Sequence, residues 1–143
     1  MKVLIVEDDP VTRHVLHTMV TKWGHDAAVA ANGDEACHWL DQNTNVSAVI
    51  AVVDWMMPGI SGPQFCQMLS SRPDAERFYT ILFTSRTGED DHHIGDLSGA
   101  DAHLAKSTDF QALKRQLGQG AGVLESRMKQ LGKPWLWSRS PGA

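Results

Sequence analysis

The chain has 143 residues, of which 42% are hydrophobic, and it carries a formal net charge of −4. This length suits one domain with a hydrophobic core, and the negative charge argues against direct nucleic-acid binding, which usually needs a basic face. No stretch approaches the roughly 20 apolar residues that cross a bilayer, and the apolar run after Lys2 is too short for a signal peptide. We therefore expect one cytoplasmic domain that binds neither nucleic acid nor membrane.

Strand and helix patterns alternate along most of the chain. Short runs of β-branched and small apolar residues predict strands at residues 2–6, 26–30, 46–53, 79–83 and 102–105. Apolar residues at helical spacing predict a helix after each strand, beginning near residues 10, 34, 65, 87 and 108. Five strand–helix units predict a three-layer α/β/α sandwich around a doubly wound parallel sheet, for which 2-1-3-4-5 is a common strand order.

Polar side chains follow four of the predicted strands, at the point where each strand ends. Glu7 and Asp8 follow the first strand, Asp54 the third, Thr84 the fourth and Lys106 the fifth. Because parallel strands end at one edge of a sheet, and strands 1 and 3 are neighbours in this order, we expect these groups to form one site.

Several carboxylates in one crevice repel each other unless a cation joins them. Oxygen ligands without an organised set of His or Cys favour Mg²⁺, and Mn²⁺ can substitute. Lys106 offers a positive charge and Thr84 a hydroxyl donor for an oxyanion bound beside the metal. The set therefore predicts a site for phosphoryl chemistry.

The same residues resemble a known family. The shared motifs are Glu7-Asp8, Asp54 within VVDWMMPGISG, Thr84 within ILFTS, Gly99-Ala100-Asp101, and Lys106. Together they are similar to the CheY-like receiver domain of two-component response regulators, over about residues 1–118. The resemblance implies a flavodoxin-like fold and a role in phosphorelay signal transduction. The implied partners are a sensor histidine kinase or phosphotransfer protein upstream, and a protein target or output domain downstream.

The resemblance also implies a role for each site residue. Asp54 would accept the phosphoryl group from a phosphohistidine and form an aspartyl phosphate. The protein ligands of magnesium would be Glu7, Asp8, Asp54 and the backbone carbonyl of Trp55. Thr84 and Lys106 would then contact the phosphoryl oxygens.

The family signals by moving its loops after phosphorylation. Thr84 would move toward the new phosphoryl oxygens, and an aromatic residue on strand 5 would turn into the vacated space. This chain has His103 there, where the family usually has Tyr or Phe. The partner face would be strand 5 with the helices predicted at 87–98 and 108–117.

Two departures from the family keep other functions open. His103 replaces the switch aromatic, and Ser107 replaces the proline that usually follows the lysine, so a phosphorylation-independent pseudo-receiver that only binds partners is one alternative. A phosphatase of the haloacid-dehalogenase type is another, but it needs a second Asp where this chain has Met56. A bulky residue at that position also suggests slow loss of phosphate. We expect no enzyme activity beyond such self-dephosphorylation.

The segment after residue 118 is expected to be separate from the receiver. Gly118, Gly120 and Gly122 predict a hinge, followed over 119–131 by a linker or short helix. A coiled-coil-like seam in this region leaves a homodimer open and comprises Leu117, Ala121, Leu124, Met128 and Leu131. Residues 132–143, which include Trp135 and Trp137, would form a flexible tail or a docking peptide.

Overall fold

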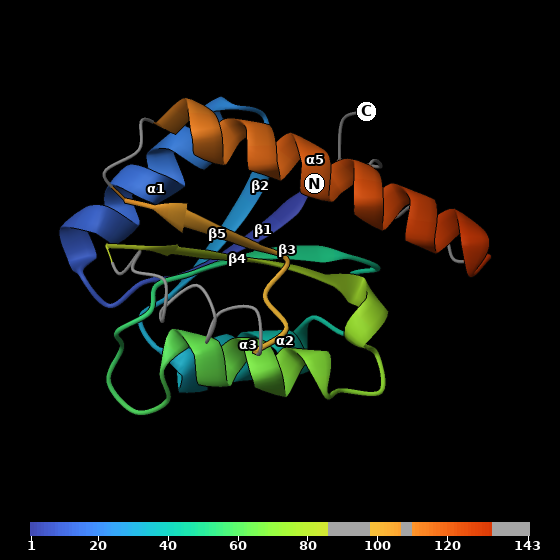
Figure 1. Cartoon of the computed structure of the whole chain (residues 1–143), viewed down its shortest axis with the longest axis horizontal. Coiled ribbons are helices and arrows are strands. Elements are labelled where there is room, and N and C mark those ends of the chain that lie inside the picture. The colour runs from blue at the N-terminus through green and yellow to red at the C-terminus, as the bar shows by residue number, and fades with distance from the viewer. Residues whose placement is uncertain (86–97, 107–109, 133–143) are drawn as a thin grey trace.

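A computed structural model describes residues 1–85, 98–106 and 110–132 (Figure 1). Its strands are β1 (Lys2–Val6), β2 (Asp26–Ala30), β3 (Val49–Val53), β4 (Phe78–Thr84) and β5 (Ala102–Ala105). Its helices are α1 (Pro10–Lys22), α2 (Gly33–Gln42), α3 (Gly62–Ser70), the 3-10 turn η1 (Ala75–Arg77) and α5 (Phe110–Gln130).

The strands form one parallel sheet in the order β2-β1-β3-β4-β5, which confirms the predicted flavodoxin-like order. Helices α1 and α5 cover one face, and α2 and α3 cover the other (Figure 1). Each face has its own buried apolar cluster, and every residue of β3 and β4 is buried. Burial on both faces explains why β3 is a continuous apolar run and why β4 is apolar except for Thr80 and Thr84.

Side-chain caps fix where the helices begin. Asp9 accepts a hydrogen bond from the Thr12 amide at the start of α1, and Asn32 accepts one from the Glu35 amide at the start of α2. Ser61 and Gln64 form a complete capping box at α3. These caps hold the helices that follow β1, β2 and β3, and therefore the loops at the carboxyl edge of the sheet.

Helix α5 has no hinge at Gly118, Gly120 and Gly122, where one was predicted. It runs without interruption through all three glycines, so the prediction of a break there was wrong. Gly120 packs against the ring of Tyr79, where an added Cβ would lie 2.7 Å from a ring carbon. Leu124 and Met128 are buried in the same core cluster. The helix stays continuous because its second half packs on the sheet, which offsets the low helix propensity of glycine.

The prediction of a coiled-coil seam is also wrong, because most residues of that pattern pack on the sheet. Leu117, Leu124 and Met128 face the core of their own domain and are at most 1% exposed, so they are not available to another helix. Leu131, the last member of the pattern, is 51% exposed.

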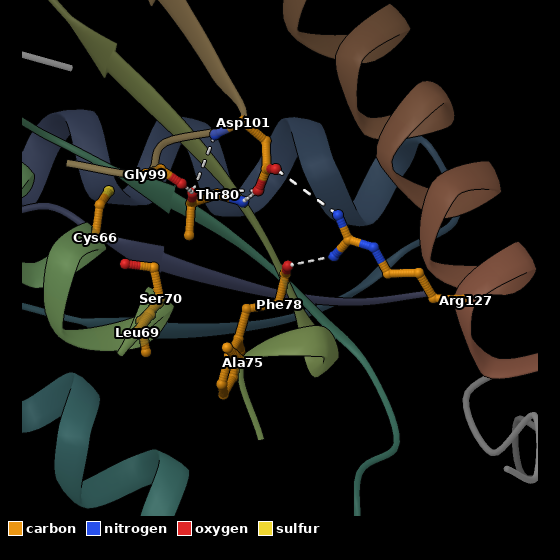
Figure 2. A pocket seen from close by; sticks show the side chains of 9 residues that line it. All are labelled: Cys66, Leu69, Ser70, Ala75, Phe78, Thr80, Gly99, Asp101 and Arg127. Carbon is orange, nitrogen blue, oxygen red and sulfur yellow. Dashed lines mark hydrogen bonds and ion pairs between the residues drawn. The ribbon is translucent and has the colours of Figure 1, made fainter. Parts of the chain in front are cut away.

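Arg127 anchors the far end of α5 at the start of β4 (Figure 2). Its guanidinium donates a hydrogen bond to the Phe78 carbonyl at 3.1 Å and lies 3.9 Å from the carboxylate of Asp101. Asp101 in turn accepts a hydrogen bond from the Thr80 amide at 2.8 Å. These groups border a cavity of about 180 Å³ between α3 and the loop before β5. They tie α5 to the edge of the sheet opposite the predicted site.

Three expectations fall outside the described residues. These are residues 87–97 of the helix expected at 87–98, Ser107 with residues 108 and 109 at the start of the last predicted helix, and residues 133–143 of the tail. Among the described residues, no helix is long and apolar enough to cross a membrane.

Candidate functional site

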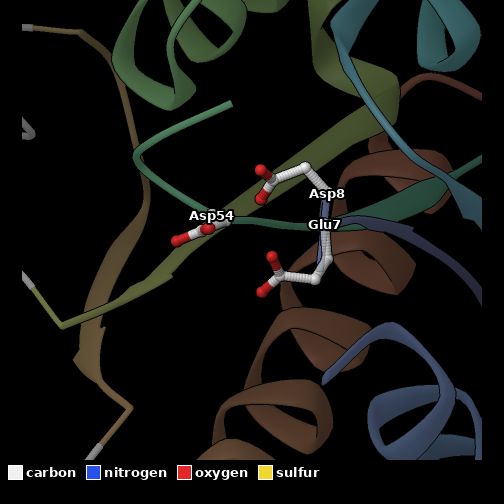
Figure 3. A group of neighbouring side chains, drawn as sticks. All are labelled: Glu7, Asp8 and Asp54. Carbon is white, nitrogen blue, oxygen red and sulfur yellow. The ribbon is translucent and has the colours of Figure 1, made fainter. Parts of the chain in front are cut away.

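Three carboxylates meet at the carboxyl edge of the sheet (Figure 3). Val6 pairs with Val53 in the β1–β3 register, so Glu7 and Asp8 follow one strand where Asp54 follows its neighbour. One carboxylate oxygen from each of Glu7, Asp8 and Asp54 lies within 4.8 Å of the others. Glu7 is buried, Asp54 is half-buried and Asp8 is exposed. The structure therefore brings together the acidic residues that the sequence predicted, with one side open to solvent.

Lys106 completes the charge pattern from the end of β5. Its ammonium nitrogen lies 2.6 Å from Oε1 of Glu7 and 3.3 Å from Oδ1 of Asp54. Burial by itself lowers the pKa of Lys106, but its hydrogen bond to Glu7 and the negative charge of Asp54 raise it above the ordinary value. The lysine therefore stays charged and bridges two of the three carboxylates.

Glu7 is the most strongly perturbed acid of the cluster. Its pKa is raised to about 7, mainly by burial and to a lesser degree by the nearby charge of Asp54, while the hydrogen bonds from Lys106 and from the Asp9 amide oppose the rise. Its second oxygen accepts the Asp9 amide at 3.2 Å. A buried carboxyl with a raised pKa beside other carboxylates is the situation that a bound cation relieves.

Thr84 ends β4 next to Lys106. It pairs with Ala105 in the β4–β5 register, and its carbonyl accepts a hydrogen bond from the Lys106 amide at 2.9 Å. The Thr84 side chain is buried. Thr84 and Lys106 thus lie on adjacent strand ends at the same edge as the carboxylates, as the sequence predicted.

His103 lies on the side of the sheet that Trp55 covers. The two ring centroids are 5.9 Å apart with an interplanar angle of 33°. In the β4–β5 register, His103 pairs with Leu82, and Leu82 lies two positions before Thr84 in the chain. Its ring therefore packs next to the residue that follows Asp54, and its role as a switch stays a prediction.

The loop after Asp54 is closed by Gly62. The Gly62 amide donates a hydrogen bond to the Trp55 carbonyl at 2.7 Å, and an added Cβ at Gly62 would overlap the Asp54 carbonyl oxygen. The Asp54 side chain accepts the Trp55 amide at 2.8 Å. The Trp55 carbonyl, predicted as a metal ligand, therefore already has one hydrogen-bond partner, and its role in metal binding stays a prediction.

Sequence reasoning missed two residues that hold this site in place. Gly62 permits the tight approach described above. Arg13 of α1 donates from its guanidinium to the carbonyl oxygens of Glu7, at 3.0 Å, and Asp8, at 3.5 Å. The capping pattern Ser61-x-x-Gln64 was a local signal for the loop that Gly62 closes, whereas nothing in the local sequence marks Arg13 as a partner of the acidic pair.

The donor set suits a small divalent cation. All three side chains offer carboxylate oxygens, and one side of the cluster is open to water, which fits the preference of Mg²⁺ for oxygen ligands and retained waters. Burial, with a smaller effect of the Asp54 charge, raises the pKa of Glu7, and a bound cation would offset both effects. The residues present therefore fit a magnesium ion.

Comparisons with known proteins agree with this geometry. A family model described as the response regulator receiver domain matches residues 3–118. The phosphate regulon transcriptional regulatory protein PhoB of Rhizobium meliloti is 31% identical over 105 residues, which is 73% of this chain and 45% of that protein. The chain thus spans about half the length of that relative. A chemotaxis protein CheY homolog of Campylobacter jejuni is 28% identical, and the match covers 87% of this chain and all of that protein.

A solved structure extends the comparison to the fold. The response regulator protein TrrA of Thermotoga maritima, solved in complex with Mg(2+)-BeF, has a TM-score of 0.70 and 28% identity. The match covers 82% of this chain and 96% of that one.

Proposed function

The chain belongs to the response regulator receiver domain family, and from this premise we propose that it accepts a phosphoryl group on Asp54 and passes the signal on through a protein-interaction face. The observation that carries this proposal is the convergence of three carboxylates, from the ends of β1 and β3, on the ammonium group of Lys106. The family is one of signalling domains, so we do not propose turnover of a substrate.

Glu7, Asp8 and Asp54 would hold Mg²⁺, with the Trp55 carbonyl as a further oxygen ligand. When bound, the ion neutralises charge on the phosphoryl oxygens during transfer. The Mg(2+)-BeF complex of the similar protein TrrA supports this assignment. Lys106 forms ion pairs with Glu7 and Asp54, so its ammonium group can pair with the added negative charge on Asp54 when the phosphoryl group arrives.

In the transfer step, an Asp54 carboxylate oxygen attacks phosphorus in line with the P–N bond of a phosphohistidine. The new O–P bond forms as the P–N bond breaks, and the electron pair of that bond stays on the imidazole nitrogen. Lys106 stabilises the extra negative charge on the phosphoryl oxygens through a charge-assisted hydrogen bond. The donor is a sensor histidine kinase or a phosphotransfer protein.

The switch would start at Thr84 and Lys106, which lie next to each other at the strand ends. A phosphoryl group adds about −1.5 to −2 charge and new acceptor oxygens, which draw the Thr84 hydroxyl toward Asp54. His103, packed against Trp55, would respond to that movement and alter the surface of β5. The downstream partner is a protein target or an output domain that reads this face.

A phosphoryl mimic tests the proposal without a cognate kinase. Addition of Mg²⁺ and beryllofluoride to the ¹⁵N-labelled chain should shift the amide resonances of Asp54, Thr84, His103 and Lys106, and Asp54→Asn should abolish these shifts. If only the resonances of Glu7, Asp8 and Asp54 shift, the mimic binds at the phosphoacceptor but does not trigger the proposed switch at Thr84 and His103. A folded chain without any shift would favour the pseudo-receiver alternative, and release of phosphate from a phosphomonoester would favour the phosphatase.

A further inference from the structure

In the part of the chain that the structure describes, no strand lies beyond β2, and this edge of the sheet borders a groove that the proposed function does not use. β2 is the outermost strand on its side, and Val29 within it is 44% exposed. A groove of about 400 Å³ runs between β2 and α2, lined by Val29, Asp34, Glu35, His38, Trp39 and Gln42. The strand reads DAAVA, without the lysine or proline that commonly protects an edge from pairing with another strand.

The groove combines an apolar wall with negative charge. Val29 and Trp39 supply apolar surface, with the Lys2 ammonium 5.5 Å from the Trp39 ring centroid, and Asp34 and Glu35 are exposed acids on the rim. The carboxylate of Asp26, at the start of β2, is 77% exposed although it pairs with Lys2. A ligand that complements this surface carries positive charge and a large flat apolar group, and it can add hydrogen bonds along the open edge.

One segment of this chain has that chemistry. Residues 133–143 read KPWLWSRSPGA, with two cationic side chains, no acidic side chain and two tryptophans. Trp135 and Trp137 are two positions apart, so both indoles lie on one face when the segment is extended. A strand added beside β2 would place that face toward α2 and the groove, and Lys133 and Arg139 at either end would meet the acidic rim.

The length of chain between Arg127 and the two tryptophans indicates which copy of the chain supplies the segment. Arg127 is held beside β4, and a strand beyond β2 lies four strand spacings from β4, about 19 Å away. Three helical residues and five further residues lead from Arg127 to Trp135, and even full extension of those five would give a span of at most about 22 Å. The segment would also have to pass from the α5 face of the sheet to the α2 face. The maximum span exceeds the distance across the sheet by only about 3 Å, which leaves too little length for the crossing between the two faces. The tail of a second copy therefore fits the groove better than the chain's own tail.

We propose that residues 133–143 of a second copy of this chain dock in the groove between β2 and α2 as an added strand, with the two indoles against Trp39 and the α2 side of β2. Because each copy has one tail and one groove, reciprocal exchange closes a two-fold dimer.

A mixing experiment tests this in the full chain. The ¹⁵N-labelled chain carries Trp135→Ala and Trp137→Ala, so its groove is intact and its own tail is inactive, and unlabelled wild-type chain is added to it. We expect amide shifts in Asp26–Ala30 and along α2. Adding Glu35→Lys or Val29→Lys to the labelled chain should weaken the interaction at least tenfold. Val11→Lys, a matched change at an exposed valine of α1, should leave it unchanged.

Each other outcome overturns the proposal. Shifts on another face would mean that the tail binds elsewhere. Equal shifts from an unlabelled chain with both tryptophans replaced would show that the tail is not the occupant, and no shifts would show that the groove takes another partner. If the β2 resonances of wild-type chain depend on its own tryptophans but not on concentration, the tail of the same chain fills the groove. None of these measurements uses a phosphoryl donor, so they succeed or fail independently of phosphorylation at Asp54.

Discussion

The ammonium nitrogen of Lys106 lies 2.6 Å from Oε1 of Glu7, although the two residues are 99 positions apart in the chain. This contact joins the first and last strands of the sequence across the site, and it competes with any cation for the same buried carboxylate. Under the proposed function, the lysine would oppose metal binding while it assists phosphoryl transfer.

Lys106→Met should separate these two effects. Removing a positive charge next to Glu7 should tighten Mg²⁺ binding by up to roughly tenfold, or ~1.4 kcal/mol, and should slow phosphorylation because the phosphoryl oxygens lose a cation. Tryptophan fluorescence, with Trp55 directly after Asp54, can follow the Mg²⁺ titration. Lys114→Met, at an exposed position of α5, is the matched control and should change neither quantity. Weaker Mg²⁺ binding in Lys106→Met would contradict the account.

Arg13→Met should loosen the acidic pair. The guanidinium fixes the backbone of Glu7 and Asp8 through their carbonyls, so its loss should weaken Mg²⁺ binding by about three- to tenfold, which corresponds to ~1 kcal/mol. Arg13→Lys keeps the charge but places it on a more flexible side chain without the planar guanidinium, and should recover only part of the affinity. A lower melting temperature with unchanged Mg²⁺ affinity would mean that Arg13 supports the fold but not the site.

The three glycines of α5 should respond differently to alanine. Gly118 and Gly122 have no atom near the position of an added Cβ, so Gly118→Ala and Gly122→Ala should each stabilise the domain by about 0.5–1 kcal/mol. Gly120→Ala should destabilise it by about 1–3 kcal/mol, because the new methyl group meets the Tyr79 ring. Urea unfolding of the three variants checks this order. Stabilisation by Gly120→Ala would show that α5 does not pack closely on β4.

Protonation of Asp74 should lower the free energy of unfolding at acidic pH. A hydrogen bond from Arg72, with a second from Arg77, lowers the pKa of Asp74 to about 2. A carboxyl whose pKa is lower in the folded state contributes stability above its unfolded pKa, near 4, and loses that contribution as the pH falls toward 2. Wild type should therefore lose about 1–2 kcal/mol more than Asp74→Asn between pH 5 and pH 2. Parallel urea titrations at both pH values measure the difference, and equal losses would contradict it.

Local sequence patterns were sufficient for the sheet and for the side chains at its edge. The β2 and β5 runs have the predicted bounds, and Glu7, Asp8, Asp54, Thr84 and Lys106 lie at one edge because parallel strands end there. The third strand begins at Val49 and not at residue 46, since a run of apolar residues does not mark where pairing begins.

The features that the sequence did not predict depend on contacts between distant residues. Glycine propensity predicted a break in α5, but burial of Leu124 and Met128 keeps the helix intact. Arg13 reaches carbonyl groups, which carry no side-chain signature, and Gly62 matters because of how closely it approaches Asp54. Such contacts become visible only when the packed chain is known.

Intact-mass spectrometry after incubation with Mg²⁺ and acetyl phosphate shows whether Asp54 accepts a phosphoryl group. We expect one phosphoryl adduct on the wild-type chain, which is absent in Asp54→Asn and absent when the metal is removed with a chelator. An adduct that persists in Asp54→Asn, or a folded wild-type chain that binds Mg²⁺ and gains no adduct, would contradict the assignment of Asp54 as the phosphoacceptor.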